Sequence, residues 1–80
     1  MEDERIRDRI EELVAEEHRL LDAGADGGLT EGEHARLETV GVELDQCWDL
    51  LRQRRARRDA GQDPDLAEPR PQGTVENYLQ

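Results

Sequence analysis

Apolar side chains recur at every third or fourth position in two long stretches of the chain, which is the spacing that lines one face of an α-helix. The first stretch covers about residues 3–23, and the second covers about residues 31–60. The apolar positions of the first are Ile6, Ile10, Leu13, Val14, Leu20 and Leu21. Those of the second are Leu37, Val40, Leu44, Cys47 and Leu51, with Val42, Trp48 and Leu50 widening the stripe. The pattern therefore predicts two amphipathic helices.

The residues between the two stretches predict a turn. Residues 22–29 hold three glycines and two aspartates, a composition that ends a helix and reverses the chain. Thr30 is followed three positions later by Glu33, which is the spacing of a capping box at the start of a helix. Gly61 follows the second stretch and predicts its end. A connection this short makes the two helices antiparallel neighbours.

The predicted fold class is therefore all-α: an antiparallel two-helix hairpin over residues 1–61, which could pair with a second hairpin into a four-helix bundle. Pairing outward from the turn brings Leu13 near Val40, Ile10 near Leu44 and Ile6 near Trp48. The same register sets two acidic residues beside three arginines at the open end of the hairpin. These are Asp3 and Glu4 on one helix and Arg52, Arg54 and Arg55 on the other. Because the second helix is longer, its arginine-rich end should overhang the first.

Residues 62–80 differ in composition from the hairpin and predict an extended strap. Three prolines, which lack a backbone N–H group, favour that conformation. They are Pro64, Pro69 and Pro71. Near the end, Val75, Tyr78 and Leu79 share one face of a single helical turn, which is too short to be stable alone in water. We expect this turn to dock on Trp48, either in the same molecule or in a neighbouring one.

The composition limits what the chain can do alone. Charged residues make up 40% and hydrophobic residues 34% of the 80 positions, with one Trp, one Tyr and no Phe. A chain this short and this polar builds a thin core, so a partner should cover part of its apolar surface. Its 21 acidic and 11 basic residues give a formal net charge of -10. A charge of that sign repels nucleic acid and anionic membranes, and we expect neither as a partner.

The expected compartment is the cytoplasm. The sequence begins with acidic residues rather than with the basic and apolar regions of a secretory signal. No apolar run approaches the roughly 20 residues of a membrane-spanning helix. Cys47 is the only cysteine, which excludes an intramolecular disulfide and suits a reducing environment.

The turn partly resembles a calcium-binding EF-hand loop. The segment from Asp22 to Glu33 has the twelve-residue length of such a loop, but its third position is Gly24, which offers no side-chain oxygen. Glu33 is also explained already as the capping acid. The candidate oxygen ligands are Asp22, Asp26, Gly28, Thr30 and Glu33. We expect no metal, and a calcium-binding helix–loop–helix remains the alternative.

No group of residues predicts a catalytic or cofactor site. His18 and His34 lie on different helices without the spacing of a metal-binding pair. Cys47 lies on the apolar stripe, where a cysteine acts as a small hydrophobe more often than as a nucleophile. The arginines of residues 52–58 could hold an anionic ligand, which is a further alternative. Nucleic acid is not expected there, because no aromatic residues alternate with the arginines.

Several short stretches of the chain resemble a known family. They are EEHRL at residues 16–20, DQCWDLLRQRRARRDAG at residues 45–61, DPD at residues 63–65 and YLQ at residues 78–80. With these, nearly the whole chain resembles the small actinobacterial proteins known as domain of unknown function 2630. The resemblance implies a helical hairpin and no catalytic activity.

The function predicted from the sequence is that of a small cytoplasmic interaction or assembly module that is not an enzyme and needs no cofactor. Its partner should be another protein or a second copy of the chain in a homodimer. The contact residues are expected on the second helix and near the end of the chain. They are Cys47, Trp48, Leu51, Arg52, Arg54, Arg55, Val75, Tyr78 and Leu79.

Overall fold

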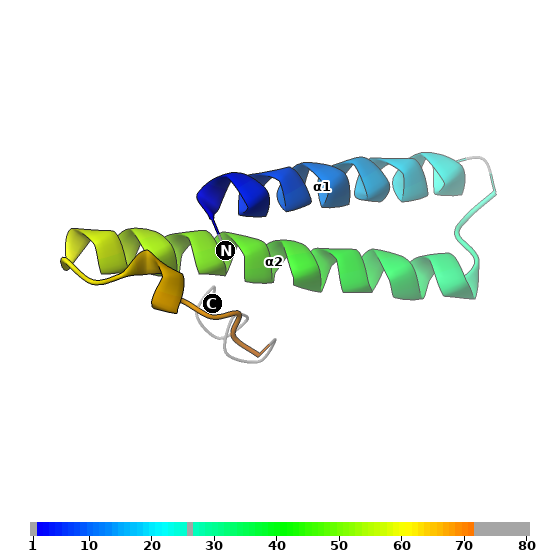
Figure 1. Ribbon diagram of the computed structural model, residues 1–80. Coiled ribbons are helices and arrows are strands. Elements are labelled where there is room, and N and C mark those ends of the chain that lie inside the picture. The colour runs from blue at the N-terminus through cyan, green and yellow to red at the C-terminus, as the bar shows by residue number, and fades with distance from the viewer. Residues whose placement is uncertain (1, 26, 72–80) are drawn as a thin grey trace.

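The computed structural model describes residues 2–25 and 27–71, and most of these residues are helical (Figure 1). The elements are α1 (Asp3–Ala25), α2 (Glu31–Asp59) and a short 3₁₀ helix, η1 (Pro64–Leu66). Helices α1 and α2 lie side by side and antiparallel, and the segment after α2 turns back along another side of it (Figure 1). Within the described ranges no residue is in a strand. The prediction of an all-α two-helix hairpin is confirmed.

Helix α1 forms because its apolar residues fall on one side. Ile6, Ile10 and Leu13 are buried there at spacings of three and four positions. Its first turn is acidic, and negative charge is favoured at that end by the partial positive charge of the helix dipole. The helix continues to Ala25, past the expected end near residue 23.

The turn after α1 depends on two glycines. Gly28 has a φ of +79°, in the left-handed region that glycine adopts without strain. Its N–H donates a hydrogen bond of 2.9 Å to the carbonyl oxygen of Gly24, inside α1. A Cβ atom at Gly24 would lie 2.8 Å from Cδ2 of Leu29. The missing side chain therefore lets Leu29 fold back onto the end of the helix.

Both ends of α2 are capped. The Thr30 hydroxyl accepts a hydrogen bond of 3.1 Å from the N–H of Glu33, and the Glu33 carboxylate accepts one of 2.9 Å from the N–H of Thr30. This is the capping box that the sequence predicts. At the other end, Gly61 has a φ of +72° and the N–H of Gln62 donates to the Arg57 carbonyl oxygen at 2.7 Å. These are the features of a Schellman motif, which ends the helix.

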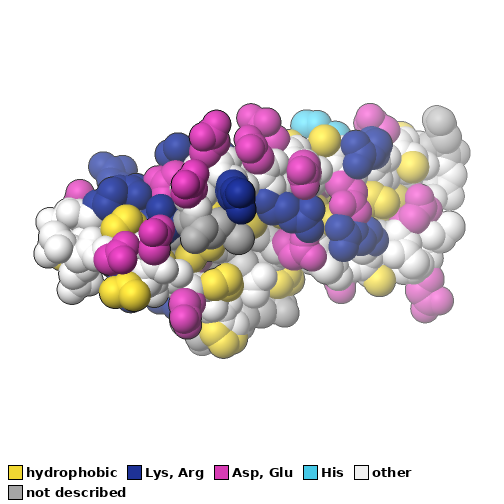
Figure 2. Space-filling view, viewed as in Figure 1, with side chains coloured by type: hydrophobic (Ala, Val, Ile, Leu, Met, Phe, Trp, Pro, Cys, Tyr) yellow, Lys and Arg dark blue, Asp and Glu magenta, His cyan; other side chains and the backbone are white. Residues whose placement is uncertain are grey.

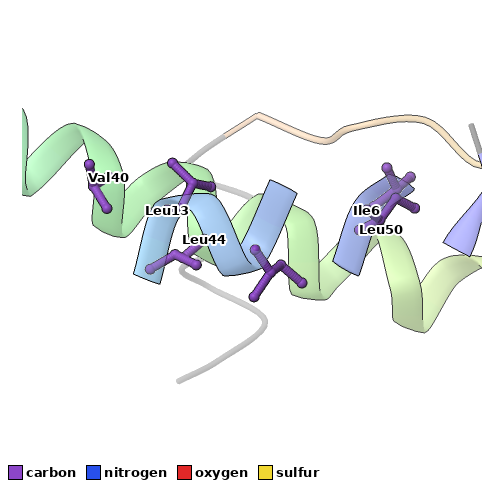
Figure 3. Close-up of a cluster of buried hydrophobic side chains, with 6 residues drawn as sticks. Ile6, Leu13, Val40, Leu44 and Leu50 are labelled. Carbon is purple, nitrogen blue, oxygen red and sulfur yellow. The ribbon is translucent and has the colours of Figure 1, made fainter. Parts of the chain in front are cut away.

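The core is a thin layer between α1 and α2. Its buried apolar side chains are Ile6, Ile10, Leu13, Val40, Leu44 and Leu50 (Figure 3). Leu13 lies between Val40 and Leu44, close to the expected register (Figure 3). The expectation that Ile6 packs on Trp48 is wrong, because Leu50 lies beside Ile6 and Trp48 is 49% exposed. Leu50 lies two positions after Trp48, which is a rotation of about 200° around the helix, so the two side chains point to nearly opposite sides of α2 and Trp48 falls outside the side that faces α1.

The strap is fixed along α2 by hydrogen bonds from glutamine side chains. Gln53 donates to the carbonyl oxygen of Glu68 at 2.8 Å, and Gln46 donates to that of Arg70 at 3.2 Å. The strap is not extended throughout, since η1 forms one 3₁₀ turn of it behind an Asp63 cap. The strap therefore covers a second side of α2, while α1 covers the first (Figure 1).

Candidate interaction surface

Trp48 lies on a side of α2 that neither α1 nor the described part of the strap covers, and its side chain is half exposed. Around it the surface forms a hollow of about 230 Å³. The residues that line the hollow are Asp3, Arg7, Trp48, Leu51, Arg52, Arg55 and Arg58. We call these residues the Trp48 surface. It combines an indole and a leucine with four arginines and one aspartate.

The helical repeat explains why these side chains meet. Leu51 and Arg52 follow Trp48 by three and four positions, and Arg55 follows them by four and three, which makes these side chains neighbours on the surface of α2. Arg7 reaches the same hollow from α1. The glutamines that bond to the strap lie on a different side of α2, so the described part of the strap, residues 62–71, leaves this surface open.

Two arginines of the Trp48 surface, Arg7 and Arg55, form no ion pair with any residue in the part of the chain that the structure describes. Both are exposed. In Figure 2, arginine side chains gather around the end of the molecule at which α2 finishes. A locally positive area therefore exists on a chain whose net charge is -10.

The acidic member of the Trp48 surface, Asp3, is held by two other arginines. It accepts hydrogen bonds from Arg58, at 2.8 and 3.2 Å, and from Arg54. The bonds from Arg58 and then from Arg54 lower the pKa of Asp3 from 3.8 to about 2. The predicted register also placed Arg52 and Arg55 beside Asp3, but Arg52 lies 3.8 Å from the Asp49 carboxylate, and Arg55 forms no ion pair among the described residues. Because the charge of Asp3 is balanced, the surface around Trp48 stays basic.

Arg54 occupies a different place from the one expected of a contact residue. Its side chain is 7% exposed and bonds to Asp3 in α1, to the Asp65 carboxylate at 2.9 Å and to the Pro64 carbonyl oxygen at 3.2 Å. These bonds, the one to Asp3 first, raise the pKa of Arg54. Arg54 therefore joins α1, α2 and η1 from within the fold. The arginine-rich end of α2 is partly covered by the strap rather than a free overhang.

The ion pair between the buried Asp49 and Arg70 was not predicted from the sequence. Asp49 is fully buried and accepts hydrogen bonds from Arg70 and, at 2.9 Å, from Gln53. The bond from Arg70 is the main reason that the pKa of Asp49 is lowered. A signal was present, because Asp49 interrupts an apolar run and Arg70 is the one basic residue in residues 59–80.

Cys47 lies away from the Trp48 surface. It lines a second hollow, of about 360 Å³, together with Ile6, Leu50 and Pro69 among others. Cys47 and Leu51 both pack against the buried core. Burial raises the pKa of the Cys47 thiol, which therefore stays protonated at neutral pH. Cys47 acts here as a small apolar side chain.

Comparison with known proteins places the chain in a family. Residues 2–80 match the model of a family described as protein of unknown function (DUF2630). The chain belongs to this family. Uncharacterised proteins of Mycobacterium bovis and Mycobacterium tuberculosis are 51% identical to it over 70 residues, which cover 86% of this chain and 80% of theirs. No solved structure matches the chain. The resemblance to the DUF2630 proteins is thus confirmed.

In this DUF2630 chain, two of the five candidate calcium ligands in the turn cap helix α2. Thr30 and Glu33 bond to each other's backbone, and the bonds from Thr30 lower the pKa of Glu33. Asp22 lies within α1, and Asp26 lies outside the described residues. Among the residues that the structure describes, no three His, Cys, Asp or Glu side chains are grouped so as to hold a metal ion. The calcium alternative gains no support from this geometry.

Two further predictions for this DUF2630 chain concern the docking of its last residues and the membrane. Val75, Tyr78 and Leu79 lie outside the described residues, so their docking on Trp48 stays a prediction. Neither helix in the described ranges has the length and hydrophobicity that a membrane-spanning helix needs.

Proposed function

We propose that this protein is a non-catalytic interaction module that binds another protein chain through the Trp48 surface. The observation that carries the proposal is the half-exposed indole of Trp48 beside Arg7 and Arg55. Trp and Arg are among the residue types most enriched where single side chains dominate the free energy of protein–protein binding. Burial of an exposed indole by a partner removes apolar surface from water, which lowers the free energy of the complex.

The charge of the Trp48 surface indicates the chemistry of the partner. Arg7 and Arg55 have no acidic counterpart among the described residues, so they are available to acidic side chains of another chain. At short range they attract an acidic protein segment. The net charge of -10 acts at longer range and opposes the approach of a polyanion such as nucleic acid. An acidic protein segment with an apolar side chain for Trp48 fits both conditions.

The pKa shifts of the titratable groups support a non-catalytic role. Asp3 and Asp49 have lowered pKa values because arginines of the fold hold them in the charged form. The raised pKa of Cys47 keeps its thiol protonated and a poor nucleophile. A general acid or base works best with a pKa near the working pH, and these groups are shifted away from it.

Photo-crosslinking in cells tests this function. A photoreactive phenylalanine derivative replaces Arg55 on the Trp48 surface, and in a matched control it replaces Asp8, which is exposed on α1. We expect position 55 to form covalent adducts with protein chains and position 8 to form few or none. Equal yields from the two positions, or none from either, would contradict the proposed function.

A further inference from the structure

The charges of α2 are divided between its two halves. Residues 31–47 hold five acidic residues and one arginine, whereas residues 48–59 hold five arginines and two aspartates. Trp48 lies at the junction between them. Glu38 lies toward the start of α2, about 80° around the helix from Trp48, and Arg55 lies toward the end, about 20° from it. A helix with this division is complementary in charge to a second copy of itself that runs in the opposite direction.

Gly41 offers space for a large side chain of another molecule. It precedes Trp48 by seven positions, which is about two helical turns, so the two residues lie on the same side of α2. A Cβ atom at Gly41 would meet no other atom within 4 Å. The position therefore faces open space rather than α1 or the strap, and an aromatic ring can approach the backbone of α2 closely there.

Helix α1 continues the same side of the hairpin with apolar residues. Arg7, Val14 and Leu21 follow one another at intervals of seven, so they lie along one edge of α1 that begins at the Trp48 surface. Leu21 is 51% exposed, comparable with Trp48. Apolar area is thus left uncovered at both ends of this side, and a second hairpin can cover it.

We propose that the partner is a second copy of this chain, packed antiparallel with Trp48 side against Trp48 side to form a four-helix bundle. This inference rests on the proposed function, because it names the partner of the same surface. In an antiparallel pair with two-fold symmetry, the residue numbers of any two side chains that face each other add up to the same total. We set this register by placing Trp48 beside the open position at Gly41, so that it lies against the segment between Gly41 and Asp45 of the second copy. In the same register, Arg55 lies between His34 and Glu38 of the second copy.

The available area suits a stable dimer. In this register the part of α2 that two copies share, residues 32–59, is about 40 Å long at about 1.5 Å per residue, and a hairpin is about 20 Å wide. Each copy would bury roughly 800 Å², which is about the area per partner of a standard interface. The hairpin needs such cover, because the described residues bury only six apolar side chains within the chain.

Light scattering of the purified full chain after size exclusion tests the dimer. Between about 1 and about 500 micromolar we expect monomer to convert to dimer. Gly41→Arg should raise the dissociation constant at least about tenfold, because its side chain would occupy the place of Trp48 and add repulsion to Arg52 of the second copy. Gly32→Arg is the matched control: Gly32 is also an open helical glycine, but on the opposite side of α2, so the constant should change by less than about twofold. Circular dichroism checks that both variants keep their helices.

Charge reversal tests the antiparallel register. Arg55→Glu and Glu38→Arg should each raise the dissociation constant about tenfold, because each places like charges together between copies. The double variant should return to within about threefold of the original chain, since the pair is restored with its signs exchanged. Residues 38 and 55 are too far apart along α2 to pair within one chain. A double variant that dimerises no better than the weaker single variant would rule out this register.

Two outcomes would overturn the inference as a whole. One is a chain that stays monomeric up to about 500 micromolar. The other is a dimer that Gly41→Arg leaves unchanged, because the copies would then meet through another surface. If position 55 still crosslinks to other proteins in cells, the proposed function survives without the homodimer. If it crosslinks to nothing and the chain is monomeric, both fail.

Discussion

Arg54 and Asp49 show what buried charge does in this small protein. Arg54 joins Asp3 at the start of α1 to Asp65 in η1, and Asp49 holds Arg70 in the strap. Each pair links segments far apart in the sequence, so it fixes the position of one element against another. Removing the partners of Arg54 or Asp49 would leave a buried charge without compensation, which is strongly unfavourable. These residues are therefore tied to the fold and are not free to act on a partner.

The ion pairs of Asp3 predict a specific response to acid. Its folded pKa of about 2 lies below the ordinary 3.8, so its stabilisation is present above about pH 3.8 and is lost as the pH falls through about 2. Asp3→Asn should therefore lower the free energy of unfolding at neutral pH, and its difference from the original chain should shrink to a small part of that value near pH 2. Urea unfolding followed by circular dichroism between about pH 7 and about pH 2 measures this difference.

Glu4→Gln is the control for that measurement, because Glu4 is an exposed acid in the same helical turn and has no ion pair among the described residues. Its effect should be smaller than that of Asp3→Asn at neutral pH. A destabilisation by Asp3→Asn that is as large near pH 2 as at neutral pH would show that Arg54 and Arg58 contribute nothing through the charge of Asp3.

The ends of α2 could be predicted from the sequence because each cap uses residues a few positions apart. Thr30 and Glu33 form the capping box, and Gly61 supplies the left-handed residue that closes the helix. The choice between Trp48 and Leu50 as the partner of Ile6 could not be made in the same way. Spacings of three and four allow either side chain to face α1, and the packing of the whole hairpin decides between them.

A pair of glycine variants tests this account of α2. Gly61→Ala should lower the free energy of unfolding by about 1 kcal/mol, because an alanine at a φ of +72° is strained. Gly32→Ala should raise it by about 0.5 kcal/mol, because Gly32 is helical and a methyl group there meets no neighbour within 4 Å. Urea unfolding of both variants measures the two changes. Changes of the same sign would contradict the cap at Gly61 or the open position at Gly32.

The path of the strap and the make-up of the Trp48 surface needed the three-dimensional structure. The sequence indicated prolines and an extended segment, but the strap is placed by Asp49 and Arg70, which are 21 positions apart. Arg7 joins Trp48 from the other helix, whereas Arg54 is withdrawn from the surface by its bonds within the chain. The spacing of residues along one helix does not predict contacts between residues so far apart in the sequence, although it does predict the hairpin itself.

Two electrostatic effects oppose each other when two copies of this chain meet. Each copy has a net charge of -10, which repels the other over a distance between centres of about 20 Å. This repulsion is largely screened near 0.1 M salt, where the Debye length is about 10 Å, but not near 0.01 M, where it is about 30 Å. Contacts between the acidic and basic halves of α2 act over about 4 Å, so strong screening of them requires about 1 M salt, where the Debye length is about 3 Å.

We therefore predict that the dimer is tightest near about 0.1 M salt and that its dissociation constant rises several-fold toward both about 0.01 M and about 1 M. Sedimentation velocity over a series of sodium chloride concentrations measures the constant. The double variant Arg55→Gln with Glu38→Gln keeps the net charge but removes one complementary pair at each end of the interface. The dissociation constant of this double variant should still rise toward about 0.01 M salt, but it should rise less than that of the original chain toward about 1 M salt. A dissociation constant of the original chain that falls steadily from about 0.01 to about 1 M would mean that apolar contacts hold the copies together and that the divided charge of α2 plays no part.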